Sequence, residues 1–349
     1  MARSTSSLRS SVPLSDMAPH PFVPWHSVRR SASLRGGGVT SPRRAGGPTC
    51  SACDDRGMAA PADWTEVAQR CWMRRYPEWD VTVGVVAGSD GLAVIDTRAT
   101  AGQGRSLRDD VRRLSSSPIR WVVNTHQHFD HTFGNIAFDD AEIWAHENAA
   151  MGLDAHARWV REQRRENLAN GEEAPPITTD VLQDVLDTRL RPADRTFSSV
   201  AVLDLGDRGA ELVYCGRGHT DGDLVVRVPD VDVVFAGDLV EQSGRPSYGP
   251  DCFPLEWPAA LEMVLGVVTD GGTVLPGHGS PVDREFVQRQ HGDVAVVANT
   301  IGQLASSGVP LAAALDEGDW PWERAHLEHA VRRGYEHAAG PSDQLRIIS

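Results

Sequence analysis

The residues best suited to chemistry lie close together in residues 121–132, WVVNTHQHFDHT. His126, His128, Asp130 and His131 fall within six residues. Neutral imidazoles and a carboxylate suit zinc, with iron or manganese as substitutes. In an extended loop His126 and His128 point to the same side and can share one ion, which leaves Asp130 and His131 free to turn toward a second. The cluster predicts a metal site; the alternative is a polar loop of hydrogen-bonded histidines.

Three further candidates repeat this pattern later in the chain. His219 lies in GRGHTDGD, Asp238 in FAGDLV and His278 in LPGHGS. Each follows an apolar run that predicts a strand, and each is flanked by glycine, which lets the backbone approach a small ion. Taken alone, each is more typical of a structural loop residue. Together with the first cluster, they predict one constellation.

The elements that must position these residues are short strands and amphipathic helices. Residues 119–123 predict a buried strand, so the first cluster lies at its carboxyl end, where open α/β sheets place their chemistry. Further strands are expected at 81–87, 92–95, 141–145, 200–205, 211–214, 224–228, 231–236 and 273–275, and helices at 106–114, 157–169, 257–267 and 284–304. The turns 88–91 and 229–230 predict hairpins. Strands with helices, followed by strands with helices again, predict an α/β fold of two similar layers packed face to face.

Three segments stand apart from this pattern. Residues 1–60 are rich in Ser, Arg, Pro and Gly, and they predict a disordered tail ahead of a domain at 61–349. Residues 147–195 lack strand character and predict a helical insertion, either a lid or substrate wall or a solvated excursion. Residues 299–349 predict a C-terminal helical extension that packs on the core, rather than lining the pocket or forming a dimer contact. It carries Trp320, Trp322, His326, His329 and His337.

The tail contains two motifs that we interpret as chance. Arg29 and Arg30 resemble a twin-arginine export signal, but the apolar core that should follow is missing. Cys50 and Cys53 form a CxxC without a second pair, which is weak evidence for a metal site. Met58 opens a chain that reads as a complete domain, so the tail is interpreted as lying upstream of the true start.

Composition limits the classes of partner. The chain has 34 basic and 48 acidic residues and a net charge of −14, and all the basic residues are arginine. An acidic surface repels polyanions, so nucleic acid is not expected as a partner. Five cysteines are few and odd in number, which favours a reducing, cytoplasmic compartment. No apolar run is long enough for a membrane span. A small-molecule substrate is expected, and the oligomeric state stays open.

The ordered motifs HQHFDH, GHTDGD, GDLV and PGHG resemble the metallo-β-lactamase superfamily over residues 64–285. The resemblance implies an α/β four-layer αββα sandwich that holds two Zn²⁺ ions at one edge of the sheets. It implies that Asp238 bridges both ions and that Asp96 supports the ligand loops, with Thr220 and Asp223 in similar supporting positions. The implied ligands are His126, His128 and His219 for the first ion, and Asp130, His131 and His278 for the second.

Exclusion narrows the branch of the superfamily. Several β-lactamase subclasses have a cysteine where Asp238 stands, or lack a bridging carboxylate, so penicillin hydrolysis is disfavoured. Flavodiiron oxygen reductases have a glutamate at the position of His128. The tRNA-processing nucleases recruit basic exosites, which this acidic chain lacks. What remains resembles the glyoxalase II, lactonase and general hydrolase group, although the C-terminal helical domain of glyoxalase II is not recognisable.

The resemblance implies a zinc-dependent hydrolase whose metal-bridging hydroxide attacks an ester, thioester, lactone or amide. Asp130 is the expected catalytic residue, which orients the nucleophile and passes its proton to the leaving group. Tyr248 is a candidate oxyanion donor, with a surface tyrosine as the alternative, and Arg217 or Arg245 is a weak candidate for binding a substrate anion. The competing hypotheses are a persulfide dioxygenase with one iron, a phosphodiester hydrolase and a non-enzymatic scaffold.

Overall fold

The computed structural model describes residues 63–171 and 177–338. The predicted tail at 1–60, including Cys50 and Cys53, lies outside the described residues. Within them the chain forms two mixed β-sheets with helices on their outer faces. No helix in this part of the chain is both long and apolar enough to cross a membrane.

The larger sheet has seven strands in chain order. They are β1 (Thr65–Ala68), β2 (Cys71–Arg75), β3 (Thr82–Ala87), β4 (Leu92–Ile95), β5 (Ile119–Val123), β6 (Glu142–His146) and β7 (Arg195–Phe197). The β3–β4 hairpin is antiparallel, as predicted from its turn, and β4 to β7 run parallel. Because β4, β5 and β6 are parallel, their carboxyl ends meet at one edge of the sheet. That edge receives the histidine cluster.

The smaller sheet has five strands, in the order β12-β11-β10-β9-β8. Their bounds are β8 (Val200–Asp204), β9 (Gly209–Tyr214), β10 (Leu224–Val228), β11 (Val233–Glu241) and β12 (Thr273–His278). Apolar side chains of both sheets, among them Ile95 of β4, Leu212 of β9 and Phe235 of β11, share one buried cluster. The two sheets therefore pack face to face.

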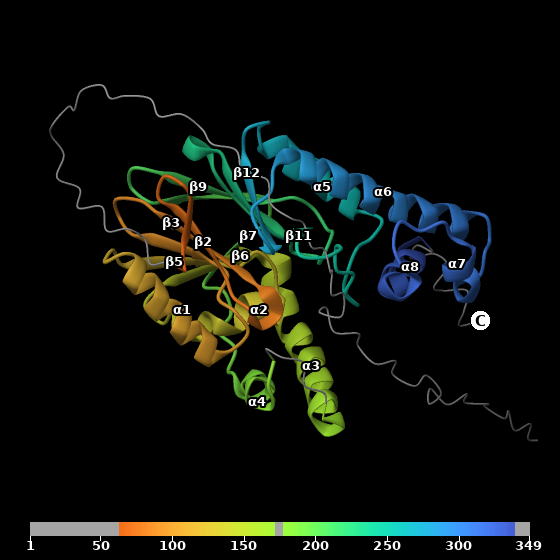
Figure 1. The fold of residues 1–349 in the computed structure, drawn as a ribbon, viewed down its shortest axis with the longest axis horizontal. Helices are drawn as coiled ribbons and strands as arrows, with labels where there is room; N and C mark the ends of the chain where they lie inside the picture. Colours follow the sequence, from red (N-terminus) through yellow and green to blue (C-terminus); the bar gives the residue numbers. More distant parts are fainter. Residues whose placement is uncertain (1–62, 172–176, 339–349) are drawn as a thin grey trace, which may run out of the picture. The chain divides into compact units, whose positions relative to one another are not determined.

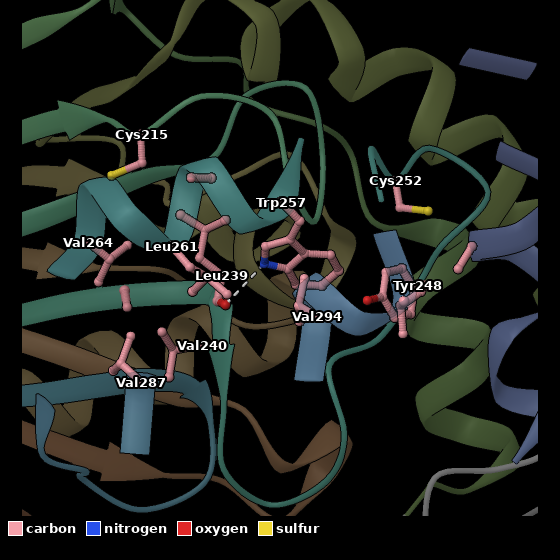
Figure 2. Packing of buried hydrophobic residues seen from close by; sticks show 14 of the residues in the cluster. Cys215, Leu239, Val240, Tyr248, Cys252, Trp257, Leu261, Val264, Val287 and Val294 are labelled. Atoms are coloured by element: carbon pink, nitrogen blue, oxygen red, sulfur yellow. Dashed lines mark hydrogen bonds between the residues drawn. The ribbon is translucent and has the colours of Figure 1, made fainter. Parts of the chain in front are cut away.

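Helices cover both outer faces, which completes the αββα layering (Figure 1). The helices are α1 (Ala101–Leu114), α2 (Phe129–Thr132), α3 (Glu147–Asn170), α4 (Thr179–Asp187), α5 (Trp257–Val267), α6 (Arg284–Ser306), α7 (Leu311–Glu317) and α8 (Arg324–Ala338); the 3-10 turns are η1 (Glu78–Asp80), η2 (Phe133–Ala137) and η3 (Pro229–Val231). Leu107 and Val111 of α1 pack on the larger sheet. Helices α5, α6 and α8 share a core with the smaller sheet; Figure 2 shows part of it, with Trp257 donating to the Leu239 carbonyl.

Two helices begin earlier than predicted. Helix α1 starts at Ala101 instead of residue 106, and the Thr100 hydroxyl accepts a hydrogen bond from the Gln103 N–H at its first turn. Helix α3 starts at Glu147 instead of residue 157. The first turn of α1 contains glycines and a polar residue, which have no apolar periodicity to reveal it. The start of α3 does carry buried apolar residues at helical spacing, Ala149, Leu153 and Ala157, and sequence reasoning overlooked this signal. Helix α4 was missed altogether, as were strands β1 and β2.

Two strands extend farther than predicted, which corrects the position of two candidate ligands. Strand β11 continues to Glu241, so Asp238 lies within the strand, beside a register shift, and not in a loop after it. Strand β12 continues to His278, its last residue. Gly237 lies at the irregularity in the pairing of β11 with β12, and Pro276 lies on β12, the edge strand, which are positions where a sheet tolerates glycine and proline.

The C-terminal helices pack on the core, as predicted. Trp320 and Trp322 lie in the connection between α7 and α8 and contact the core of the smaller sheet, together with Leu315 and Tyr335. Helices α6 and α8 are packed against each other. This part of the molecule is therefore a continuation of the outer helical layer.

Candidate metal centre

The loop after β5 carries the histidine cluster into the interior of the molecule. It leads directly into the short helix α2, whose Asp130 and His131 are buried. His126 is 1% exposed and the His128 side chain 12% exposed. The hydroxyl of Thr132 donates to the His128 carbonyl, 2.9 Å away, and closes the loop. The loop after β5 and the first turn of α2 therefore carry four ligand-type side chains within six residues.

The second sheet brings the remaining three candidates to the same place. His219 comes from the loop between β9 and β10, Asp238 from β11 and His278 from the end of β12. All three are buried. The strand edges of the two sheets thus meet at one cluster of seven side chains, as the motif order implied.

One half of the cluster contains three histidines. His128 Nδ1 lies 2.8 Å from His219 Nε2, and the His126 ring is 4.6 Å from the His128 ring. Asp238 Oδ2 lies 3.6 Å from His126 Nε2 and 3.4 Å from His219 Nε2. Ligand-type atoms of these four residues all lie within 4.8 Å of one another, a spacing that one metal ion can span.

The other half contains Asp130, His131 and His278. His131 Nε2 lies 3.4 Å from His278 Nε2 and 3.7 Å from Asp130 Oδ2, and His278 Nε2 lies 3.5 Å from the same oxygen. Asp238 faces this group as well, with Oδ1 3.3 Å from His131 Nε2 and Oδ2 3.2 Å from His278 Nε2. Asp238 therefore stands between two groups of ligands.

The donor set fits metal ions. The Nε2 atom of His126 is buried and makes no hydrogen bond within the described part of the chain. A buried polar atom without a partner is costly, and a metal ion would supply that partner. Imidazole nitrogens with carboxylate oxygens are the ligands of zinc and of similar transition metals.

The electrostatics of the cluster keep two imidazoles neutral, as metal ligands must be, and favour positive charge beside the carboxylates. Burial lowers the pKa of His219 to about 4, and burial with the charge of His131 lowers the pKa of His126 well below its ordinary value. Burial opposes protonation of His278 too, but Asp238 overrides it and raises the pKa to about 10. Carboxylates that stabilise a charged imidazole here would also stabilise a divalent cation.

Asp96, expected to support the ligand loops, contacts them directly. Its backbone has a positive φ of 66° at the end of β4. Its carboxylate accepts from the Thr125 N–H and hydroxyl at 2.9 and 2.8 Å, and lies 2.8 Å from His131 Nδ1. The hydrogen on Nδ1 leaves His131 Nε2 free to face the cluster. Thr220 and Asp223 bond to each other, at 2.8 and 2.6 Å, and stabilise the turn that holds His219.

Sequence reasoning missed several residues that touch the ligands. Asp251 contacts His128, and His156 of α3 stacks on His128 with ring centroids 4.3 Å apart. The Ser247 carbonyl lies 2.9 Å from His219 Nδ1, and the Ser247 N–H donates to Glu241. None belongs to a motif, because each reaches the site only through tertiary packing. The only sequence signal that could have indicated these residues is the presence of hydrogen-bonding side chains in the 147–195 insertion and in the loop after β11.

Three other candidates are not in catalytic positions. The interpretation of Tyr248 as a surface residue is wrong: it is 5% exposed and its ring packs 5.0 Å from that of Trp257, in the core shown in Figure 2. Its hydroxyl is buried and makes no hydrogen bond within the described residues. Arg217 pairs with Glu256 at 2.7 Å and Arg245 pairs with Glu323, so both guanidinium groups are already neutralised at exposed positions.

Known proteins share this sequence pattern and this fold. The metallo-beta-lactamase superfamily matches residues 76–311. The metallo-beta-lactamase type 2 of Bacillus cereus is 27% identical over 202 residues, covering 57% of this chain and 67% of the relative. The acyl-coenzyme A thioesterase MBLAC2 of Homo sapiens is 25% identical over 213 residues, covering 59% of this chain and 71% of the relative.

A solved structure shows the same fold over more of the chain. The stereoselective inverting sec-alkylsulfatase from Pseudomonas sp. has a TM-score of 0.63 at 17% identity, covering 82% of this chain and 51% of that one. Because the superfamily match spans most of the chain and includes all seven clustered side chains, the family follows from sequence and fold together. The chain belongs to the metallo-beta-lactamase superfamily and is a hydrolase of that superfamily.

Proposed function

We propose that this protein is a dinuclear zinc hydrolase that cleaves an ester, thioester, lactone or amide bond of a small molecule. His126, His128 and His219 would hold the first ion, Asp130, His131 and His278 the second, and Asp238 would contact both. The observation that carries the proposal is the position of Asp238, whose carboxylate lies 3.2 to 3.6 Å from imidazole nitrogens of both groups.

The protein's own residues have separate tasks in this proposal. When bound, the two ions would lower the pKa of a shared water and polarise the carbonyl of the substrate. Asp130 lies beside His131 and His278, and its side chain is 11% exposed. It can therefore take a proton from an incoming water and return it to the leaving group. Asp96 and the Ser247 carbonyl hold His131 and His219 with their ligand nitrogens toward the cluster.

An acyl thioester is the first substrate to test. The human relative is an acyl-coenzyme A thioesterase, and it aligns over 71% of its own length. Esters, lactones and amides complete the panel, because the same attack on a carbonyl serves all four classes. Penicillins belong in the panel as a control for the resemblance to the Bacillus cereus enzyme.

The test compares the zinc-loaded protein with His128→Ala on each substrate. We expect hydrolysis of at least one acyl substrate by the parent protein, and loss of both activity and bound metal in the variant. Full turnover by His128→Ala with both ions bound would contradict the ligand assignment. Oxygen uptake with a persulfide, or cleavage of a phosphodiester alone, would replace the acyl hydrolase by one of the competing chemistries.

A further inference from the structure

The imidazole of His128 is held from both sides. Its Nδ1 lies 2.8 Å from His219 Nε2, inside the cluster, whereas its Nε2 lies 3.1 and 3.3 Å from the two carboxylate oxygens of Asp251. A neutral imidazole carries one hydrogen. With that hydrogen on Nε2 and donated to Asp251, the lone pair of Nδ1 faces the first metal position.

Asp251 is itself fixed by the loop that it supports. The side-chain amide of Gln127 donates to Asp251 Oδ2 at 3.1 Å. Gln127 immediately precedes His128, so one carboxylate contacts two successive residues of the histidine loop. Asp251 lies between β11 and α5, on a segment that carries none of the family motifs. Through Asp251, the loop that follows β11 in the smaller sheet is hydrogen-bonded to the histidine loop that follows β5 in the larger sheet.

Helix α3 adds a second contact with this arrangement through His156. The Phe129 N–H donates to His156 Nε2 at 3.2 Å, so the hydrogen of this neutral ring is on Nδ1. Nδ1 faces Asp251 Oδ2 at 3.9 Å. The ring also lies nearly parallel to His128, at 23° and 4.3 Å between centroids. His156 therefore contacts the histidine loop, the His128 ring and the Asp251 carboxylate together.

We propose that Asp251 is a positioning residue for the first metal: its carboxylate, braced by Gln127 and by His156 of α3, holds His128 with Nδ1 toward the ion. The inference rests on the proposed metal centre. It assigns the 147–195 segment a structural task at the site, because α3 supplies the outermost member of the chain His156–Asp251–His128. Partners of this kind orient a ligand ring and raise its basicity.

The experiment compares metal affinities of four full-length variants by competition with a chromophoric chelator for Zn²⁺, and records the visible spectrum of the Co²⁺ forms. Asp251→Ala is expected to bind the first ion about 10- to 100-fold more weakly. Asp251→Asn keeps an oxygen that can accept from His128 Nε2, so it should recover most of the affinity. His156→Phe keeps the stacked ring but loses the hydrogen bond from the Phe129 N–H and the polar contact with Asp251, so its loss of affinity should be smaller than that of Asp251→Ala.

The matched control is Asp110→Asn. Asp110 is a buried carboxylate that bonds to the Tyr76 hydroxyl and to Arg74, both at 2.7 Å, on α1 and away from the cluster. It should bind both ions with parental affinity and give the parental Co²⁺ spectrum. An equal loss of affinity in this control would overturn the inference, since general loosening would then explain the effect.

The other possible results also test the positioning role of Asp251. Parental affinity and Co²⁺ spectrum in a folded Asp251→Ala would overturn the positioning role. If that variant does not fold, parental affinity in His156→Phe would overturn the bracing role of α3. A third ion per chain that is lost in His156→Phe would show that His128, His156 and Asp251 form a cation site of their own, and would replace the inference. Parent protein that binds no metal would instead overturn the proposed function.

Discussion

Asp238 has little freedom to move, because Gly277 lies against it. A Cβ atom at Gly277 would stand 1.8 Å from Asp238 Oδ1 and 3.0 Å from its backbone nitrogen. Gly237, on the other side of Asp238, has a φ of 52° and no room for a side chain beside Thr125. The glycines flanking the family motifs therefore set the position of the carboxylate that faces both halves of the cluster.

The substitution Gly277→Ala tests this packing. The added methyl should displace the Asp238 carboxylate and lower metal occupancy, measured by plasma mass spectrometry after gel filtration, to less than one ion per chain. Gly292→Ala is the control, because a Cβ there meets no atom within 4 Å on α6. It should keep full occupancy and stabilise the helix by about 0.5–1 kcal/mol. Equal occupancy in the two variants would contradict the packing argument.

The thiols give a second prediction at the residue scale. Burial raises the pKa of Cys71 and of Cys215 to about 12, and raises the pKa of Cys252 further still. At pH 8, well below these pKa values, the three thiols are almost entirely protonated. They are therefore inert, because the reactive form of a thiol is the thiolate. A Cys50→Ser/Cys53→Ser variant should not react with a maleimide before unfolding in guanidinium, when three thiols should react. Rapid labelling of the native protein would contradict the burial of these side chains.

At the scale of elements, the start of α3 is packed directly against the His219 loop. A Cβ on Gly222 would meet the Ala149 backbone nitrogen at 2.4 Å, and the Asn148 side chain donates to the Asp221 carbonyl at 3.1 Å. Together with His156, these contacts fasten the first three turns of α3 to both ligand loops. These three turns of the 147–195 insertion therefore form part of the wall of the metal centre.

Gly222→Ala should force α3 away from this loop. We expect the free energy of unfolding in urea to fall by about 1–3 kcal/mol, the usual cost of overpacking. Gly266→Ala on α5, where a Cβ meets nothing within 4 Å, should not be destabilised. The same unfolding midpoint in both variants would show that α3 is not packed as described.

Sequence predicted those elements whose pattern is local. Strand β5 and helix α5 have continuous apolar or periodic runs between clear boundaries, and their bounds match the prediction. The extension of β11 through Asp238 could not be predicted, because Gly237 is conformationally free and pairing with β12 decides its state. Asp251 and His156 could not be predicted for a related reason: their partners are 123 and 28 residues away along the chain, and no short motif records such contacts.

At the scale of the whole molecule, the metal centre lies where the edges of two sheets meet, so ions bound there would connect the two halves of the sandwich. Removing them with EDTA should lower the melting temperature by several degrees, because a ligand that binds only the native state at 100 times its Kd contributes about 2.7 kcal/mol. Added Zn²⁺ should restore the parental value. His128→Ala, which lacks a ligand of the first ion, should show a smaller change in melting temperature with EDTA than the parent protein. A parent protein that is insensitive to the chelator would contradict this coupling.

The central claim is that seven side chains from both sheets hold two metal ions, and the metal content of the purified protein tests it most directly. We would measure zinc, iron and manganese per chain by plasma mass spectrometry on protein purified without added metal. The account predicts close to two zinc ions per chain in the parent protein and a clear deficit in His128→Ala. About one iron and little zinc would contradict the zinc hydrolase, and a chain that holds no metal and takes up none when zinc is added would contradict the metal centre itself.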